Sequence, residues 1–153
     1  MIVLVTGATA GFGECITRRF IQQGHKVIAT GRRQERLQEL KDELGDNLYI
    51  AQLDVRNRAA IEEMLASLPA EWCNIDILVN NAGLALGMEP AHKASVEDWE
   101  TMIDTNNKGL VYMTRAVLPG MVILLTLAQR QVAGRMPVVT FTVRRKRLFV
   151  SLA

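Results

Sequence analysis

Three glycines near the amino end, Gly7, Gly11 and Gly13, have the spacing of a turn that binds phosphate. The apolar run before them predicts a strand, and the periodic apolar residues after them predict a helix. Gly7 allows a tight exit from the strand, Gly11 lets the backbone approach a phosphate, and Gly13 lets helix and strand pack closely. Amide groups at the helix start favour an anion without a basic side chain. We therefore expect the pyrophosphate of a dinucleotide to bind at Gly7, Ala8, Thr9, Ala10, Gly11, Phe12 and Gly13.

Two arginines, Arg32 and Arg33, follow the next apolar run, residues 26–30, and could supply the second half of a nucleotide site. Guanidinium groups bind a ribose 2′-phosphate well, whereas an acidic residue at this place binds the hydroxyls of an unphosphorylated ribose. No Asp or Glu stands between Glu14 and Glu35. The pattern predicts NADP rather than NAD. The alternative is that both arginines are solvated residues at the start of a helix.

A third motif, Asn80-Asn81-Ala82-Gly83, follows an apolar run at residues 75–79. Together with the glycine motif at this separation, it makes the chain resemble the short-chain dehydrogenase/reductase family. The resemblance implies an α/β fold of the Rossmann type, with a doubly wound parallel sheet and a cofactor cleft at the carboxyl ends of its strands.

The resemblance also assigns roles to individual polar residues. It implies that Asn81 lines the cofactor cleft and that Asp54 and Val55 contact the adenine. It implies that Asn106 supports the catalytic proton relay. The alternative for each polar residue is a place in a turn or at a helix cap, and for Asn106 alone that alternative is the better one.

Over residues 1–121 the chain is most similar to bacterial NADP-dependent members that act on serine, allo-threonine, 3-hydroxypropionate and related small 3-hydroxy acids. The resemblance thus implies hydride transfer between NADP and the carbon that bears the 3-hydroxyl group. It also implies that intact members oligomerise through their long helices. Neither a membrane nor a nucleic acid is an expected partner.

The family's catalytic serine, tyrosine and lysine are missing from this chain. The two tyrosines, Tyr49 and Tyr112, are followed four positions later by Leu53 and Ala116 rather than by lysine. Loss of a positioned acid–base group costs at least ~100-fold in rate. We therefore expect no activity from this chain, and a non-catalytic NADP-binding module is the alternative function.

A sharp change of charge separates residues 122–153 from the rest of the chain. The tail has six basic and no acidic side chains, whereas residues 1–121 have 12 basic and 16 acidic ones. One interpretation is a basic interaction segment around Arg144-Arg145-Lys146-Arg147. Four adjacent charges without interleaved aromatic residues are a weak signal for nucleic acid, and a solvated tail explains them as well.

We favour a different origin, in which residues 122–153 are out-of-frame translation after a frame-changing deletion near codon 121. Synonymous codons, read one register over, can conceal the family's serine, tyrosine and lysine at Ala128-Gln129, Phe141-Thr142 and Arg145-Lys146. The hidden serine precedes the hidden tyrosine by thirteen codons and the lysine follows four later, as the family requires. The chain would then be a truncated member, with about half of the family fold in residues 1–121.

The elements that must position these residues alternate between strand and helix. Parallel strands joined by right-handed crossovers predict the strand order 3-2-1-4, with the nucleotide cleft where the order switches between the first and fourth strands. In the tail we expect a helical extension over 121–128 and a strand over 137–143. Without cover from the tail, the fourth strand would be an unpaired edge. Strands are expected at 2–6, 26–30, 48–53 and 75–79, and helices at 12–23, 33–44, 58–67 and 96–120.

The remaining composition excludes several classes of site. Cys15 and Cys73 are 58 positions apart with no CxxC pattern, and His25 and His92 are the two histidines, so no metal site is expected. Reduced thiols and the absence of a leader before the first strand predict a cytoplasmic protein. Neither apolar run in the tail reaches the ~20 residues of a membrane span.

Overall fold

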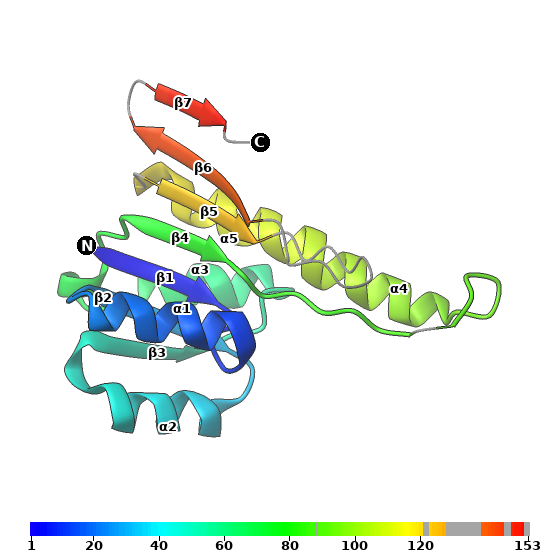
Figure 1. The fold of residues 1–153 in the computed structure, drawn as a ribbon, viewed down its shortest axis with the longest axis horizontal. Helices are drawn as coiled ribbons and strands as arrows, with labels where there is room; N and C mark the ends of the chain where they lie inside the picture. The colour runs from blue at the N-terminus through cyan, green and yellow to red at the C-terminus, as the bar shows by residue number, and fades with distance from the viewer. Residues whose placement is uncertain (88, 121–122, 128–138, 146–147, 152–153) are drawn as a thin grey trace.

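The fold is an α/β sheet flanked by helices, seen in a computed structural model that describes residues 1–87, 89–120, 123–127, 139–145 and 148–151 (Figure 1). The sheet has seven strands in the order β3-β2-β1-β4-β5-β6-β7. The strands are β1 (Ile2–Thr6), β2 (Lys26–Gly31), β3 (Leu48–Gln52), β4 (Ile77–Asn80), β5 (Ile123–Leu127), β6 (Val139–Arg145) and β7 (Leu148–Ser151). The α-helices are α1 (Gly11–Gln22), α2 (Gln34–Leu44), α3 (Arg58–Ala66), α4 (Val96–Ile103) and α5 (Leu110–Val117).

The first four strands confirm the predicted order, with β1 hydrogen-bonded to β2 on one side and to β4 on the other. All pairings from β3 to β5 are parallel, whereas β6 and β7 add antiparallel strands beyond β5. The chain leaves β1 toward β2 and later returns to place β4 on the opposite side of β1. The carboxyl ends of β1 and β4 therefore diverge into helices on different faces, which opens a crevice there.

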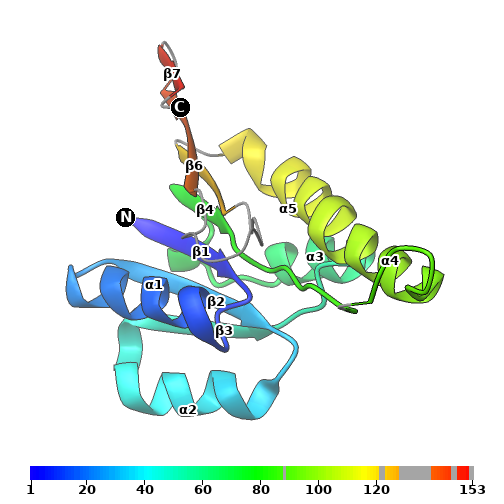
Figure 2. The same ribbon diagram turned by 45° about the vertical axis from the view of Figure 1, so that its right-hand side comes forward.

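The two faces of the sheet carry separate apolar cores, because successive side chains of a strand point to opposite sides. Val3 and Val5 of β1 pack with residues of α1 and α2, whereas Leu4 packs with residues of α3 and α5. Figure 2 shows α1 and α2 on one side of the sheet and α3, α4 and α5 on the other. Both faces of β1 are buried, so the strand is an almost continuous apolar run.

The long helix expected over 96–120 is interrupted. It consists of α4, a π-helical segment at Asp104–Gly109, α5 and a 3₁₀ turn at Leu118–Gly120. Ser95 caps α4, since its Oγ accepts a hydrogen bond from the amide of Asp98 at 3.2 Å. The π-helical segment inserts a widened turn into the helix, and such insertions often occur at functional sites.

The predicted helical extension over 121–128 is wrong, because Ile123–Leu127 forms β5 and pairs with β4. A five-residue apolar run fits a strand or a helix equally well, and the free edge of β4 decides the outcome here. The predicted strand at 137–143 is confirmed over residues 139–143, and β6 (Val139–Arg145) continues for two more residues. Positions 121, 122, 128, 137 and 138 lie outside the described residues, as does the Ala128-Gln129 position of the hidden serine.

Helices α4 and α5 expose several large apolar side chains: Val96, Trp99, Ile103 and Val111. Large apolar side chains exposed together on neighbouring helices favour association with another chain or aggregation. Among the described residues, no helix has the length and apolar character needed to cross a membrane.

Candidate nucleotide-binding site

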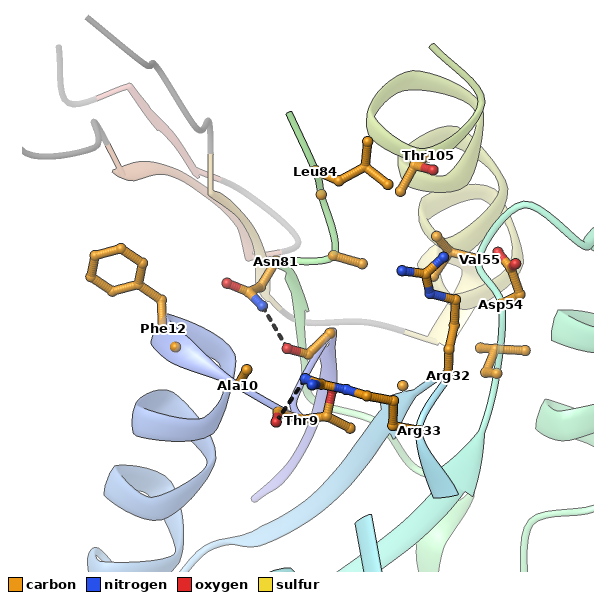
Figure 3. A pocket seen from close by; sticks show the side chains of 16 residues that line it. Thr9, Ala10, Phe12, Arg32, Arg33, Asp54, Val55, Asn81, Leu84 and Thr105 are labelled. Carbon is orange, nitrogen blue, oxygen red and sulfur yellow. Dashed lines mark hydrogen bonds between the residues drawn. The ribbon is translucent and has the colours of Figure 1, made fainter. Parts of the chain in front are cut away.

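A cavity of about 350 Å³ opens at the carboxyl ends of β1, β2 and β4. Figure 3 shows Phe12 toward one end and Arg32, Arg33 and Asp54 toward the other. The lining therefore changes from apolar to charged along its length, as an elongated ligand with chemically different ends requires. The residues around it are Gly7, Thr9, Ala10, Gly11, Phe12, Gly31, Arg32, Arg33, Leu53, Asp54, Val55, Asn81, Ala82, Gly83, Leu84 and Thr105.

The turn between β1 and α1 forms one wall of the cavity. Gly7 and Gly11 have φ angles of +67° and +56°, the left-handed region that favours glycine. The residue at the start of α1 is Ala10, and no side chain caps the helix there. The first amide groups of α1 are therefore left for solvent or an anion, and the helix dipole makes an anion favourable.

Asn81 and Thr6 join the end of β4 to the turn after β1. Asn81 Nδ2 donates to the carbonyl oxygens of Thr6 at 2.9 Å and Gly7 at 3.1 Å. Thr6 Oγ1 in turn accepts from the backbone amides of Asn81 at 3.0 Å and Ala82 at 2.9 Å. All these groups are buried or half-buried, so the side chain of Asn81 orders the turn between β1 and α1.

The predicted arginines lie at the charged end of the cavity. Arg33 Nη2 donates to Thr9 Oγ1 at 3.1 Å and to the Thr9 carbonyl oxygen at 3.2 Å. The Arg32 side chain extends toward Asp54 and Val55 (Figure 3). The two guanidinium groups thus border the cavity in different places, and each can donate charge-assisted hydrogen bonds to an anion.

Asp54 is an ionised acceptor at the same end. Arg56 binds its carboxylate through Nε at 3.0 Å and Nη2 at 2.6 Å. These side-chain hydrogen bonds hold the pKa of the Asp54 carboxyl below its ordinary value, and the positive charge of Arg32 acts in the same direction. Asp54 is therefore fixed in place and charged at neutral pH.

Asn106 lies beside the cavity rather than in its lining. Its Oδ1 accepts from the Leu84 amide at 2.9 Å and its Nδ2 donates to the Leu84 carbonyl oxygen at 2.8 Å. The side chain therefore fixes the chain after β4 against the π-helical segment. In this way Asn106 positions Leu84, which does line the cavity.

The structure brings together the predicted cofactor residues with two exceptions. Ala8 and Gly13 do not line the cavity. Ala8 is fully buried in the core under α1 and α2, and Gly13 is buried where α1 crosses the turn. Both residues contribute close packing in this structure, and their contact with a ligand stays a prediction.

Six lining residues were not among the predicted cofactor residues. Three of them, Gly31, Leu53 and Ala82, adjoin a predicted residue, and Gly83 belongs to the same motif as Asn81, so the sequence could have pointed to these four. Leu84 and Thr105 had no such signal, and Thr105 lies in the π-helical segment.

Thr105 is the basis of a stability prediction. It is 8% exposed, and its Oγ1 has no hydrogen-bond partner among the described residues. An unsatisfied buried hydroxyl costs about 1 kcal/mol or more, so Thr105→Val should raise the free energy of unfolding of the ligand-free protein by about 1 kcal/mol. Urea denaturation would measure the change.

Thr17→Val is the matched control for this prediction. Thr17 is also buried, but its Oγ1 donates to the Gly13 carbonyl oxygen at 2.8 Å. The same substitution should therefore lower the free energy of unfolding by about 1 kcal/mol. Destabilisation by both substitutions would show that the Thr105 hydroxyl has a partner in the ligand-free protein.

Neither tyrosine of the chain reaches the cavity. Tyr49 packs against Trp72 with ring centroids 5.5 Å apart, and Tyr112 lines a separate groove between α3 and α5. In the part of the chain that the structure describes, no three metal-ligating side chains gather into a site. The cavity has the chemistry of a binding site without a tyrosine acid–base group.

Comparison with known proteins gives a consistent result. Residues 1–140 match the sequence profile described as short chain dehydrogenase. The chain is 99% identical over 122 residues to the NADP-dependent 3-hydroxy acid dehydrogenase YdfG of Escherichia coli O157:H7, covering 80% of this chain and 49% of that protein. It is 50% identical over 120 residues to the serine 3-dehydrogenase of Agrobacterium fabrum, covering 78% of this chain and 48% of that protein.

The fold comparison agrees with the sequence comparison. A crystal structure of a short-chain dehydrogenase from Streptomyces avermitilis superposes with a TM-score of 0.71 at 32% identity, covering 77% of this chain and 43% of that one. The chain spans about half the length of the curated relatives it matches. Since the family profile covers most of the chain and the sheet order and glycine turn agree with it, this chain belongs to the short chain dehydrogenase family.

Proposed function

We propose that residues 1–121 form the amino-terminal part of an NADP-binding Rossmann domain and that the cavity at the ends of β1, β2 and β4 binds NADP(H). The pyrophosphate would lie at the glycine turn and the first turn of α1. The 2′-phosphate would lie between Arg32 and Arg33, and the adenine beside Asp54 and Val55. Highly similar relatives are described as NADP-dependent, which supports this assignment.

The observation that carries the proposal is that two features favourable to anions border one cavity. The uncapped start of α1 lies at one wall and the two guanidinium groups lie at the charged end. A dinucleotide with a 2′-phosphate has anionic groups in both places, whereas NAD has only the pyrophosphate. In this ligand the nicotinamide supplies the hydride chemistry, and the residues of this chain bind and orient it.

Removal of the two guanidinium groups tests the cofactor assignment. Because charge-assisted hydrogen bonds contribute about 1.5–3 kcal/mol, the double variant Arg32→Ala/Arg33→Ala should bind NADP+ at least ~10-fold more weakly. Binding of NAD+ should change little, since NAD+ lacks the 2′-phosphate. Isothermal titration with both nucleotides would measure the two dissociation constants.

Arg58→Ala is the control, because Arg58 is an exposed arginine on α3 that pairs with Glu62 at 2.9 Å and lies outside the cavity lining. It should leave both dissociation constants unchanged. Equal weakening of NADP+ and NAD+ in the double variant would contradict the assignment of these arginines to the 2′-phosphate.

For the intact protein we propose hydride transfer between NADP and the 3-hydroxyl carbon of small 3-hydroxy acids, such as serine, allo-threonine and 3-hydroxypropionate. The names of two relatives support this substrate class. We propose that the present chain does not catalyse the reaction, because its sequence lacks the serine, tyrosine and lysine set. Asn106 would keep only its supporting role. A cytoplasmic location fits the two free, exposed thiols of Cys15 and Cys73.

We further propose that residues 122–153 are out-of-frame translation. The curated relatives align over 119 to 122 residues, and the tail carries six basic and no acidic side chains. Sequencing the coding DNA from codon 118 to the stop tests this. The shifted register should encode a serine segment followed by a Tyr-x-x-x-Lys motif. If the shifted reading frame does not encode these segments, the proposal is wrong and residues 122–153 are a basic segment encoded in the correct frame.

A further inference from the structure

We propose that Thr9 is a positioning residue that holds the guanidinium group of Arg33 at the glycine turn and thereby sets the preference for a 2′-phosphorylated nucleotide. The inference rests on the proposed function, since it concerns how the cavity would distinguish NADP from NAD. It assigns a specificity role to a side chain of the turn itself, in addition to the two arginines.

The contact that supports this role joins two elements that are distant in the sequence. Thr9 lies in the turn after β1, and Arg33 precedes α2. Arg33 Nη2 donates to both oxygen atoms of Thr9, at 3.1 Å for Oγ1 and 3.2 Å for the carbonyl oxygen (Figure 3). Thr9 is 7% exposed, so its oxygen atoms do not exchange freely between Arg33 and solvent.

Holding the guanidinium group before the ligand arrives lowers the cost of binding. A free arginine side chain loses about 2 kcal/mol of rotamer entropy when it is fixed. Arg33 already has one nitrogen fixed at Thr9, whereas its remaining donors stay available for a phosphate. Part of the entropy cost of ordering Arg33 is thus incurred during folding, before the nucleotide binds. NAD+ has no 2′-phosphate to contact Arg33, so its affinity does not increase through this ordering.

Gly31 leaves room for the methyl group of Thr9. A Cβ atom at position 31 would lie 2.6 Å from Thr9 Cγ2 and 3.3 Å from Thr9 Oγ1. The Thr9 methyl group therefore occupies the space that a side chain at position 31 would need. Because a β-branched side chain has few χ1 rotamers, seating the methyl group at Gly31 restricts the direction of the hydroxyl group.

The close approach of Thr9 to Gly31 also disfavours an acidic residue at the end of β2, which is the feature that recognises an unphosphorylated ribose. An acidic side chain at the end of β2, which would accept hydrogen bonds from the hydroxyls of an unphosphorylated ribose, would overlap Thr9 if it replaced Gly31. Thr9 and Gly31 thus act together. The threonine holds a basic group in place, and its methyl group excludes an acidic one.

Two substitutions separate the hydroxyl group from the rest of the side chain. Thr9→Val keeps the branched shape and loses Oγ1, whereas Thr9→Ser keeps the hydroxyl group. Isothermal titration of the full chain with NADP+ and NAD+ should show that Thr9→Val weakens NADP+ binding about 3- to 10-fold more than it weakens NAD+ binding, the effect of one lost hydrogen bond. Thr9→Ser should retain more of the NADP+ preference than Thr9→Val.

A double-variant cycle with Arg33→Ala tests positioning directly. If Thr9 acts through Arg33, Thr9→Val should have no further effect on NADP+ binding in the Arg33→Ala background. An equal loss in both backgrounds, or equal weakening of NADP+ and NAD+ by Thr9→Val, would overturn the inference. Absence of saturable NADP+ binding by the unsubstituted chain would instead overturn the proposed function and the inference with it.

Discussion

Replacement of Gly13 by alanine is expected to abolish NADP+ binding and to lower the free energy of unfolding by about 3 kcal/mol, the upper range for an overpacked site. Gly13 is buried where α1 crosses the turn after β1. A Cβ atom there would overlap the Gly7 carbonyl oxygen and Asn81 Nδ2 and would lie 2.9 Å from the Gly7 carbonyl carbon. Alanine would favour the helix by about 1 kcal/mol, which is too little to offset a clash with backbone.

The loss of binding follows from the atoms that would move. Gly7 and Asn81 both line the cavity and are joined by the hydrogen bond from Asn81 Nδ2. Relief of the clash would shift the turn or the start of α1, and either shift would displace the amide groups that we propose receive the pyrophosphate. Chemical denaturation and NADP+ titration would measure the two effects.

Gly24→Ala is the matched control, because Gly24 lies between α1 and β2, away from the cavity. Gly24 has a φ angle of +77° and no atom within 4 Å of an added Cβ. The left-handed conformation alone should cost about 1–2 kcal/mol and leave NADP+ binding unchanged. A Gly13→Ala variant as stable as the unsubstituted chain would show that α1 packs less closely on the turn than the structure has it.

Serine-dependent reduction of NADP+ by this chain is expected to be at least ~100-fold slower than by a family member with a complete acid–base set. The reason lies in where the two tyrosines are. Tyr49 lies in β3 against Trp72, and Tyr112 lines the groove between α3 and α5, so neither could exchange a proton with a substrate in the cavity. The increase in NADPH absorbance with L-serine would measure the rate.

The serine 3-dehydrogenase of Agrobacterium fabrum, which is 50% identical over the shared 120 residues, is the positive control. NADP+ affinity, measured on the same preparation, would separate lost chemistry from lost binding. Serine-dependent turnover by the present chain at a rate comparable with the control would contradict the proposed inactivity. It would require an acid–base group other than the tyrosine of the family.

Short-range signals in the sequence were enough for much of the fold and for the phosphate-binding turn. Short apolar runs identified the first four strands, and the spacing of Gly7, Gly11 and Gly13 identified the turn between the first of them and α1. Ser95 marked the start of α4 by capping chemistry. These features depend on contacts within a few residues, so the local sequence determines them.

The sequence predicted local structure less well where that structure depends on contacts with residues distant in the chain. The run at Ile123–Leu127 could form a helix or a strand by its composition, and the free edge of β4 made it a strand. The predicted helix over 96–120 contains a π-helical segment that no local sequence pattern predicted. That segment carries Thr105 to the cavity and Asn106 to Leu84.

The sequence by itself therefore determined the family, the glycine turn and the basic character of the cofactor pocket, because these depend on residue type and spacing. Only the tertiary structure decided that Thr9 holds Arg33, that Gly31 leaves room for Thr9, and that Gly13 lies against Gly7 and Asn81. These relations join residues on different strands and helices. They depend on how close the backbones approach, and spacing along the chain does not specify that distance.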